Sequence, residues 1–86
     1  MTATPGMVLG RALDVLQGRD VLTAIRQAAG DEQLADAAIR ALADYCGYSQ
    51  LDRAAERIRH WQDTTGEHNI RATLPHAADW AEREGR

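Results

Sequence analysis

The residues of this chain best suited to chemistry are three histidines, His60, His68 and His76, and the only cysteine, Cys46. Imidazole nitrogens and a thiolate are ligands that Zn²⁺ prefers, and a cysteine beside a histidine can act as a nucleophile. Two ligands on one helix share a face only at separations of about three or four residues. Here the histidines are eight residues apart, and Gly66 interrupts the first interval. We therefore predict no metal site, no cofactor and no enzyme activity, and we interpret Cys46 as a small core residue.

The charge balance narrows the possible partners. The chain has ten basic residues, all of them arginines, and thirteen acidic residues, which gives a formal net charge of -3. A negative chain is a poor general binder of nucleic acid, because neutralised phosphates supply much of that affinity. One cysteine is typical of a reducing cytoplasm. The apolar run Met7–Leu9 is too short for a signal peptide, and no window reaches the roughly 18–20 apolar residues of a membrane span. We expect a cytoplasmic protein without membrane contact.

We expect helices to position these side chains, because no segment long enough for a strand alternates polar and apolar residues with a period of two. Glycines at 18, 30, 47 and 66 fall where an apolar stripe ends, as expected of left-handed residues just past a helix C-terminus. Thr4 with Pro5 predicts the first helix start, and Asp20, Asp31 and Ser49 predict the next three, Ser49 with Asp52 as a capping box. The inward faces are expected to hold Leu9, Ala12, Leu13 and Leu16; Val21, Leu22, Ile25, Ala28 and Ala29; Leu34, Ala35, Ala38, Ile39, Leu42 and Cys46; and Leu51, Ala54, Ala55, Ile58 and Trp61.

Pro75 leaves two solutions for the last helix, because proline in a helix interior costs about 3 kcal/mol. In the first, Thr73 caps the helix and Pro75 sits in its first turn, with Leu74, Ala77, Ala78 and Ala81 inward. In the second, the helix begins near His68 and kinks before Pro75. The first solution is preferred.

The predicted fold is all-α, a compact bundle of about five short helices. Short connections make successive helices antiparallel or sharply crossed; residues 21–47 resemble a helical-repeat hairpin, but a self-contained bundle is preferred. A chain of 86 residues makes one domain, 1–86, whose ends at 1–5 and 83–86 are expected to fray. Alanine dominates the 44% hydrophobic fraction, so helices should approach closely and leave no deep cofactor pocket.

One stretch, "ALADYCGYSQLDRAAERI", resembles a helix-turn-helix, in which residues 49–63 would read DNA. Alanine four positions before Gly47 and serine two positions after it match the motif. However, Arg53 occupies a position that is normally apolar, and Asp52 and Glu56 would face phosphates. A small transcriptional regulator is therefore the alternative function.

A second stretch, "IRHWQDTTGEHNI", resembles an uncharacterised family of small proteins from actinobacteria and their phages. The matching residues are Ile58, Trp61, Gln62, Asp63 and Gly66, followed by an alanine-rich segment, "HAADWAERE". The family has asparagine where Gln62 stands, and the similarity covers at most the C-terminal half. The resemblance implies an actinobacterial or phage source and a helix at the C-terminal end, but it implies no enzymatic reaction.

Trp61 has two interpretations. It can end a helix at a structural corner, with its ring over the core and Thr64, Thr65 and Gly66 in the turn. Alternatively, Trp61, Trp80 and His60 stay partly exposed together as a binding hot spot.

From the second interpretation we predict a protein-interaction or regulatory module. The chain would bind a partner protein, or a second copy of itself, through Trp61, Trp80, Arg57, His60 and Arg83, with an arginine facing an acidic partner.

Overall fold

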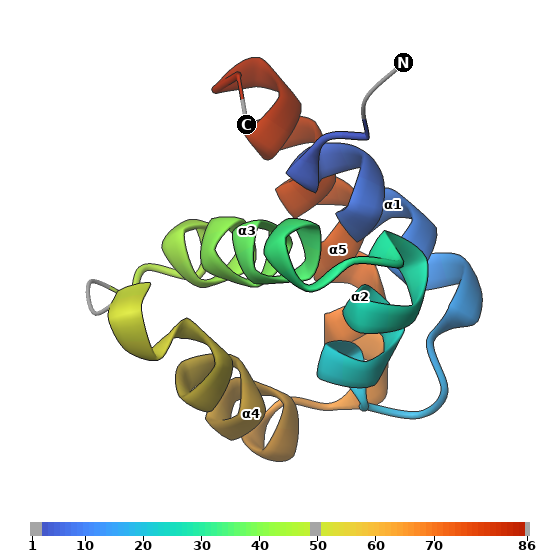
Figure 1. Ribbon diagram of the computed structural model, residues 1–86. Helices are drawn as coiled ribbons and strands as arrows, with labels where there is room; N and C mark the ends of the chain where they lie inside the picture. The colour runs from blue at the N-terminus through green and yellow to red at the C-terminus, as the bar shows by residue number, and fades with distance from the viewer. Residues whose placement is uncertain (1–2, 49–50, 86) are drawn as a thin grey trace.

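The computed structural model describes residues 3–48 and 51–85, without the Leu51 side chain. The protein is all-α, as predicted, with an order of α1 (Pro5–Val15), α2 (Val21–Ala29), α3 (Glu32–Tyr45), the short 3-10 helix η1 (Leu51–Arg53), α4 (Ala54–Thr64) and α5 (Glu67–Arg83). In Figure 1, α3 runs across α1 and α5, and α4 lies at the far end of the molecule from the last turns of α5. Within the described ranges, no helix combines the length and the apolar character needed to cross a membrane.

Three of the predicted helix starts are confirmed. Thr4 accepts a hydrogen bond from the Met7 N–H and Pro5 is the first residue of α1. Asp20 accepts from the Thr23 N–H at the start of α2, and Asp31 accepts from the Gln33 N–H at the start of α3. A side-chain oxygen at this position satisfies a backbone N–H that has no acceptor within the helix.

The predicted Ser49 cap of the fourth helix lies outside the described residues. Within them, η1 begins at Leu51 and leads directly into α4 at Ala54, which has Arg53 at its N-cap and no side-chain cap. Gly66 is a correction: its φ of -67° is not left-handed, and it precedes α5 instead of closing α4. Gly18, Gly30 and Gly47 do have the predicted positive φ.

The preferred start of the last helix is also wrong, because α5 begins at Glu67 and contains Pro75 in its interior. Proline removes the N–H that would bond the carbonyl of Arg71. Pro75 is exposed, so this carbonyl lies on the solvent side of the helix, where water can bond it. The packing of Ile70 and Leu74, both fully buried, accompanies about two additional turns on the N-terminal side of the proline. Arg83 is the last residue of α5.

The core is built largely from small residues. Nine of the twenty buried apolar residues in the described part of the chain are alanines, and none is aromatic. The predicted inward faces are confirmed in their main members, which are buried: Leu9, Ala12, Leu16, Val21, Leu22, Ile25, Ala35, Ala38, Ile39, Leu42, Ala54, Ile58, Leu74, Ala77 and Ala81. Leu13, Ala28, Ala29, Leu34, Cys46, Ala55, Trp61 and Ala78 are only partly buried against them.

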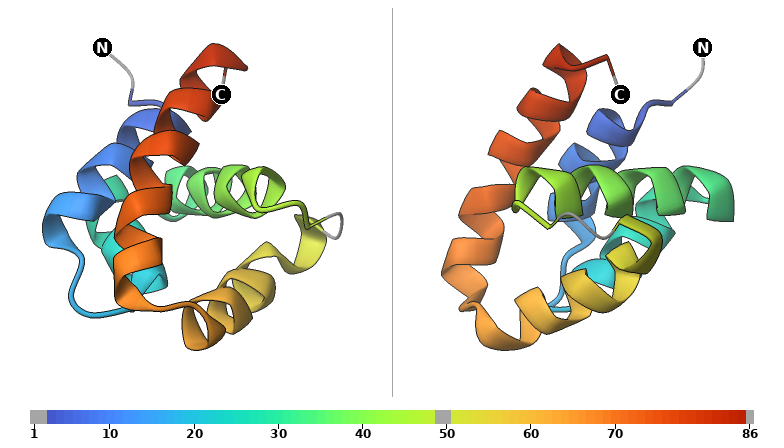
Figure 2. Two further views of the ribbon diagram at one scale, coloured as in Figure 1. Left: turned by 180° about the vertical axis from the view of Figure 1, so that it is seen from behind. Right: turned by 90° about the vertical axis from the view of Figure 1, so that its left-hand side faces the viewer.

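Helices α1 and α5 lie antiparallel and very close (Figure 2). At one end, a Cβ added to Gly6 would lie 2.9 Å from the carbonyl oxygen of Ala78 and would also meet Glu82. At the other end, the guanidinium of Arg71 donates to the carbonyl of Leu16 at 3.2 Å, just past the last turn of α1. A cation there also meets the negative end of the α1 dipole.

Helix α4 has little buried surface and is tied to α2 by a side chain. Only Ala54 and Ile58 of α4 are buried. Gln62 accepts hydrogen bonds from the backbone N–H groups of Val21 at 2.9 Å and Leu22 at 3.3 Å, in the first turn of α2. Nearby, Arg19 donates to the carbonyl of Asp63 at 3.3 Å. The amide of Gln62 therefore acts as a second cap for α2, supplied from a distant part of the chain.

The contrast between two glycines of α1 tests the close approach to α5. We expect Gly6→Ala to lower the free energy of unfolding by about 1–3 kcal/mol, because the backbone carbonyl of Ala78 cannot move away without shifting α5. Gly10→Ala is the matched control, since its Cβ would meet only the Ala78 Cβ at 4.0 Å. That variant should gain about 0.5–1 kcal/mol from helix propensity. Urea unfolding followed by circular dichroism measures both, and equal effects would contradict the packing described.

Removing the cap that Gln62 supplies should loosen α4 from α2. We expect Gln62→Ala to cost about 1 kcal/mol of unfolding free energy, because two N–H groups of α2 lose their acceptor. Gln62→Glu keeps an acceptor and should retain most of the stability at neutral pH. Gln33→Ala, an exposed glutamine on α3, is the control and should change little. Amide hydrogen exchange at Val21 and Leu22 gives the local readout; unchanged protection there in Gln62→Ala would refute the cap.

Candidate functional site

The aromatic ring of Trp80 in α5 packs against the ring of Tyr45, the last residue of α3. Their ring centroids are 5.6 Å apart and the ring planes are inclined by 58°. Such a tilted arrangement is favourable for two aromatic quadrupoles. Tyr45 is 38% exposed, whereas Trp80 is partly buried against the core. We call these two residues the aromatic edge.

Local sequence explains why Tyr45 stands at a surface. Helix α3 buries Ala38, Leu42 and their neighbours, and it ends at Tyr45. Gly47, with φ of 91°, then reverses the chain so that the N–H of Tyr48 bonds the carbonyl of Ala43 at 3.0 Å. This C-terminal turn fixes the direction of α3 and leaves the Tyr45 ring against α5.

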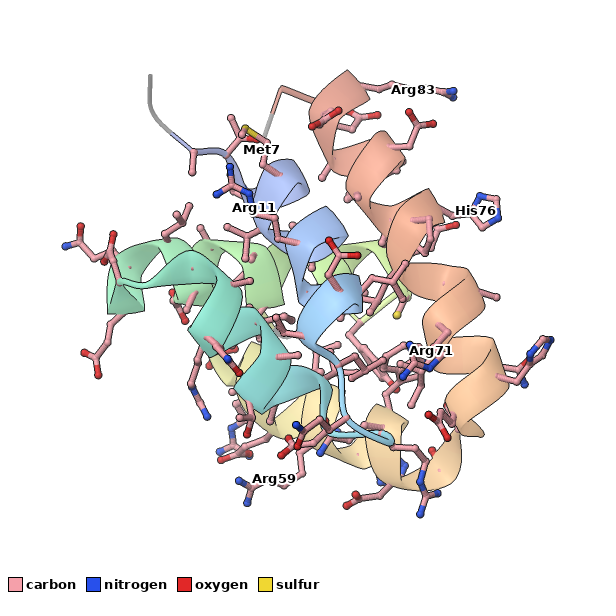
Figure 3. All side chains as sticks on the ribbon, turned by 90° about the vertical axis from the view of Figure 1, so that its right-hand side faces the viewer. Met7, Arg11, Arg59, Arg71, His76 and Arg83 are labelled. Atoms are coloured by element: carbon pink, nitrogen blue, oxygen red, sulfur yellow. The ribbon has the colours of Figure 1, made fainter. Side chains whose placement is uncertain are left out.

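Apart from Trp80 itself, Arg83 is the predicted site residue nearest to the aromatic edge in sequence. It lies one turn after Trp80 on α5 and forms an ion pair with Asp79 at 2.8 Å. Both side chains are mostly exposed, at 77% and 58%. Figure 3 shows Arg83 directed away from the body of the molecule. An ion pair so well hydrated contributes little free energy, and Asp79 cancels much of the positive charge.

Trp61, Arg57 and His60 lie together on α4, away from Arg83. At 100° per residue, Ala55, Arg59 and Gln62 share one flank of α4, and the bonds of Gln62 show that this flank faces α2. Arg57, His60 and Trp61 occupy the other side. Trp61 is partly buried against the core and His60 is exposed.

The structure does not pair the two tryptophans. Trp80 lies roughly 20 Å along α5 from Glu67, at 1.5 Å per residue, while α4 joins α5 at the Glu67 end through the turn at Gly66. Figure 3 shows the same separation, with Arg83 of α5 and Arg59 of α4 at opposite ends of the molecule. The ring that meets Trp80 is therefore Tyr45 and not Trp61.

The histidines do not gather around a common point. His60, His68 and His76 are all exposed, and Figure 3 shows His76 pointing outward. Over residues 3–48 and 51–85, no three His, Cys, Asp or Glu side chains lie close enough to hold a metal ion. Burial raises the pKa of the Cys46 thiol from 9.0 to about 11, so this half-buried cysteine carries its proton at neutral pH.

The arrangement of α3 and α4 differs from a helix-turn-helix. Residues 46–53 separate the two helices, whereas the motif joins them with about three or four residues. Near α4, the exposed acids Asp52, Glu56 and Asp63 alternate with arginines. A DNA-reading helix would instead present a net positive face to the phosphates.

Comparisons of this chain with protein-family models, with curated proteins and with solved structures gave no match. The resemblance of residues 58–66 to a small actinobacterial and phage family therefore stays a prediction. The site rests on geometry alone.

Tyr45 was not among the site residues predicted from the sequence. It lies off the apolar stripe of α3, one residue before Cys46, and its partner is 35 positions away in sequence. The sequence feature that could have indicated Tyr45 is a large aromatic residue in the last helical turn before a left-handed glycine.

The raised pKa of Cys46 predicts slow thiol chemistry. Well below pH 9 the folded chain should hold about a hundredfold less thiolate than an unfolded one, so iodoacetamide should alkylate Cys46 about a hundredfold faster in urea. Above pH 9 the unfolded chain loses its proton first, so this group should make the fold less stable as the pH rises from 9 to about 11. Mass spectrometry follows the alkylation, and equal rates with and without urea would exclude a desolvated thiol.

Proposed function

We propose that this chain is a protein-interaction module that binds a partner protein, or a second copy of itself, through the aromatic edge of Tyr45 and Trp80. The observation that carries the proposal is the exposure of Tyr45. Among the described residues, Tyr45 is the large hydrophobic residue that is exposed to solvent. Its ring packs on a partly buried tryptophan.

A supported aromatic ring is a favourable anchor for binding. Tyrosine and tryptophan bring a large contact area with few rotatable bonds, so little conformational entropy is lost when a partner covers them. Trp80 restricts the Tyr45 ring before binding, which lowers that entropy further. Residues of this kind carry most of the binding free energy in many interfaces. Arg83 would lie at the rim, where its pairing with Asp79 leaves the aromatic rings as the main source of affinity.

The flank of α4 with Arg57, His60 and Trp61 is a second candidate contact within the same function. It is favoured by the partial burial of Trp61, which leaves part of the indole at the surface. A cytoplasmic location belongs to this proposal as well, on the ground of a single cysteine without a disulfide partner.

Replacing Tyr45 by Ala tests the aromatic edge directly. We expect the variant to keep its fold, because Tyr45 is exposed, and to bind its partner about 30-fold more weakly, as truncation of an anchor costs about 2 kcal/mol. Binding is measured in two ways: sedimentation equilibrium for self-association, and capture from a lysate of the source organism with mass spectrometry. A stoichiometric companion or a dimer that Tyr45→Ala loses is the expected result.

Two controls separate the two surfaces. Trp61→Ala should retain binding if the aromatic edge is the interface, whereas Arg83→Ala should weaken it only slightly. Loss with Trp61→Ala and not with Tyr45→Ala would move the interface to α4. A chain that stays monomeric and captures no protein, or one that elutes with nucleic acid, would contradict the proposed function.

A further inference from the structure

A groove lies at the opposite end of α3 from the aromatic edge. It consists of two adjoining hollows of about 710 and 240 Å³. Arg26 and Ala55 line both hollows, so together they form one groove between α2 and α4 that reaches the first turns of α3. Tyr45 is the last residue of α3, which makes this groove a separate site and not part of the proposed interface.

The groove exists because small residues face one another across it. Ala35 of α3 and Ala55 of α4 line it where longer side chains would fill the space. Its floor is apolar, with Ile39 and Ala35 each 3% exposed and Leu22 4% exposed. Charged side chains stand along the rim. The groove therefore has an apolar bottom and polar walls, as binding grooves for protein segments do.

The rim is predominantly acidic. Asp31, Glu32 and Asp36 approach from the start of α3 and Glu56 from α4, against two arginines, Arg26 and Arg59. Asp31 is used in the cap of α3, and Asp36 is paired with Arg40 at 3.0 Å. The side chains of that ion pair are 60% and 53% exposed, so solvent screens it and the carboxylate remains open to a second cation.

We propose that this groove binds a basic segment of a partner protein, in which an apolar side chain lies between arginines or lysines. The apolar side chain would cover Ile39 and Ala55. The aliphatic stems of the basic residues would lie along the walls, with their charged ends at Glu32, Asp36 and Glu56. The negative net charge of the chain would favour the approach of such a segment.

The probe for this site is a short, fluorescently labelled helical peptide with leucine on one face and arginine on both flanks. A second peptide with every arginine replaced by glutamate is its control. Fluorescence anisotropy measures affinity, and amide chemical shifts locate the contact. We expect the arginine peptide to bind more tightly at low salt, to shift the amides of Ala35, Ile39 and Ala55, and to weaken as salt is added. The glutamate peptide should not bind.

Matched variants test whether the rim itself is responsible. Glu32→Gln with Asp36→Asn removes two negative charges and one exposed i,i+4 ion pair, and should weaken the arginine peptide about tenfold. Asp14→Asn with Asp79→Asn removes the same charge and an equivalent pair on α5, and should change affinity less than twofold. Ala55→Leu fills the groove and should abolish binding, while Tyr45→Ala should leave peptide binding unchanged.

Three results would overturn the proposal. They are equal binding of both peptides, equal weakening by the two double variants, and shifts that fall outside the groove or do not occur. Because Tyr45→Ala acts only on the aromatic edge, failure of the groove and failure of the proposed function are told apart.

Discussion

The close antiparallel contact of α1 and α5 is the constraint on which the rest of the structure depends. These helices are far apart in sequence, and their approach at Gly6 leaves no room for a Cβ. At the other end of the pair, Arg71 of α5 donates to the carbonyl of Leu16, the C-cap residue of α1. Helices α1 and α5 together form the base against which α3 packs. Shifting α5 would displace Ile70 and Leu74 from the core and Trp80 from Tyr45 in the same movement.

Helix α4 is held differently, because it contributes only two buried residues. Its position relies on packing against α3 through these residues, on the polar contact of Gln62 with the first turn of α2 and on a bond from Arg19. Elements with few buried contacts open more readily than the core. The groove is thus bordered on one side by α4, which has the fewest buried residues of the described α-helices, so a bound segment that touches both α2 and α4 would also stabilise α4.

The sequence was informative where structure is determined locally. Thr4, Asp20 and Asp31 cap helices through residues two or three positions away, so their roles could be predicted from neighbours. Pro75 and Gly66 were misjudged because tertiary burial of Ile70 extends α5 beyond what local propensity favours. The contacts of Tyr45 with Trp80 and of Gln62 with Val21 join distant segments. No periodicity in the sequence encodes which helices meet, so neither contact could be foreseen.

Both proposed surfaces follow from one property of the core. Helices separated by alanine and glycine approach too closely to enclose an indole or a phenol ring, which is why the described core holds no aromatic residue. Trp61 and Trp80 are therefore only partly buried, and Tyr45 remains at the surface. Where small residues line the space between helices, as Ala35 and Ala55 do, a groove opens instead. A core of small side chains thus leaves large rings available outside it and leaves apolar hollows between its helices, and both are features that a protein partner can use.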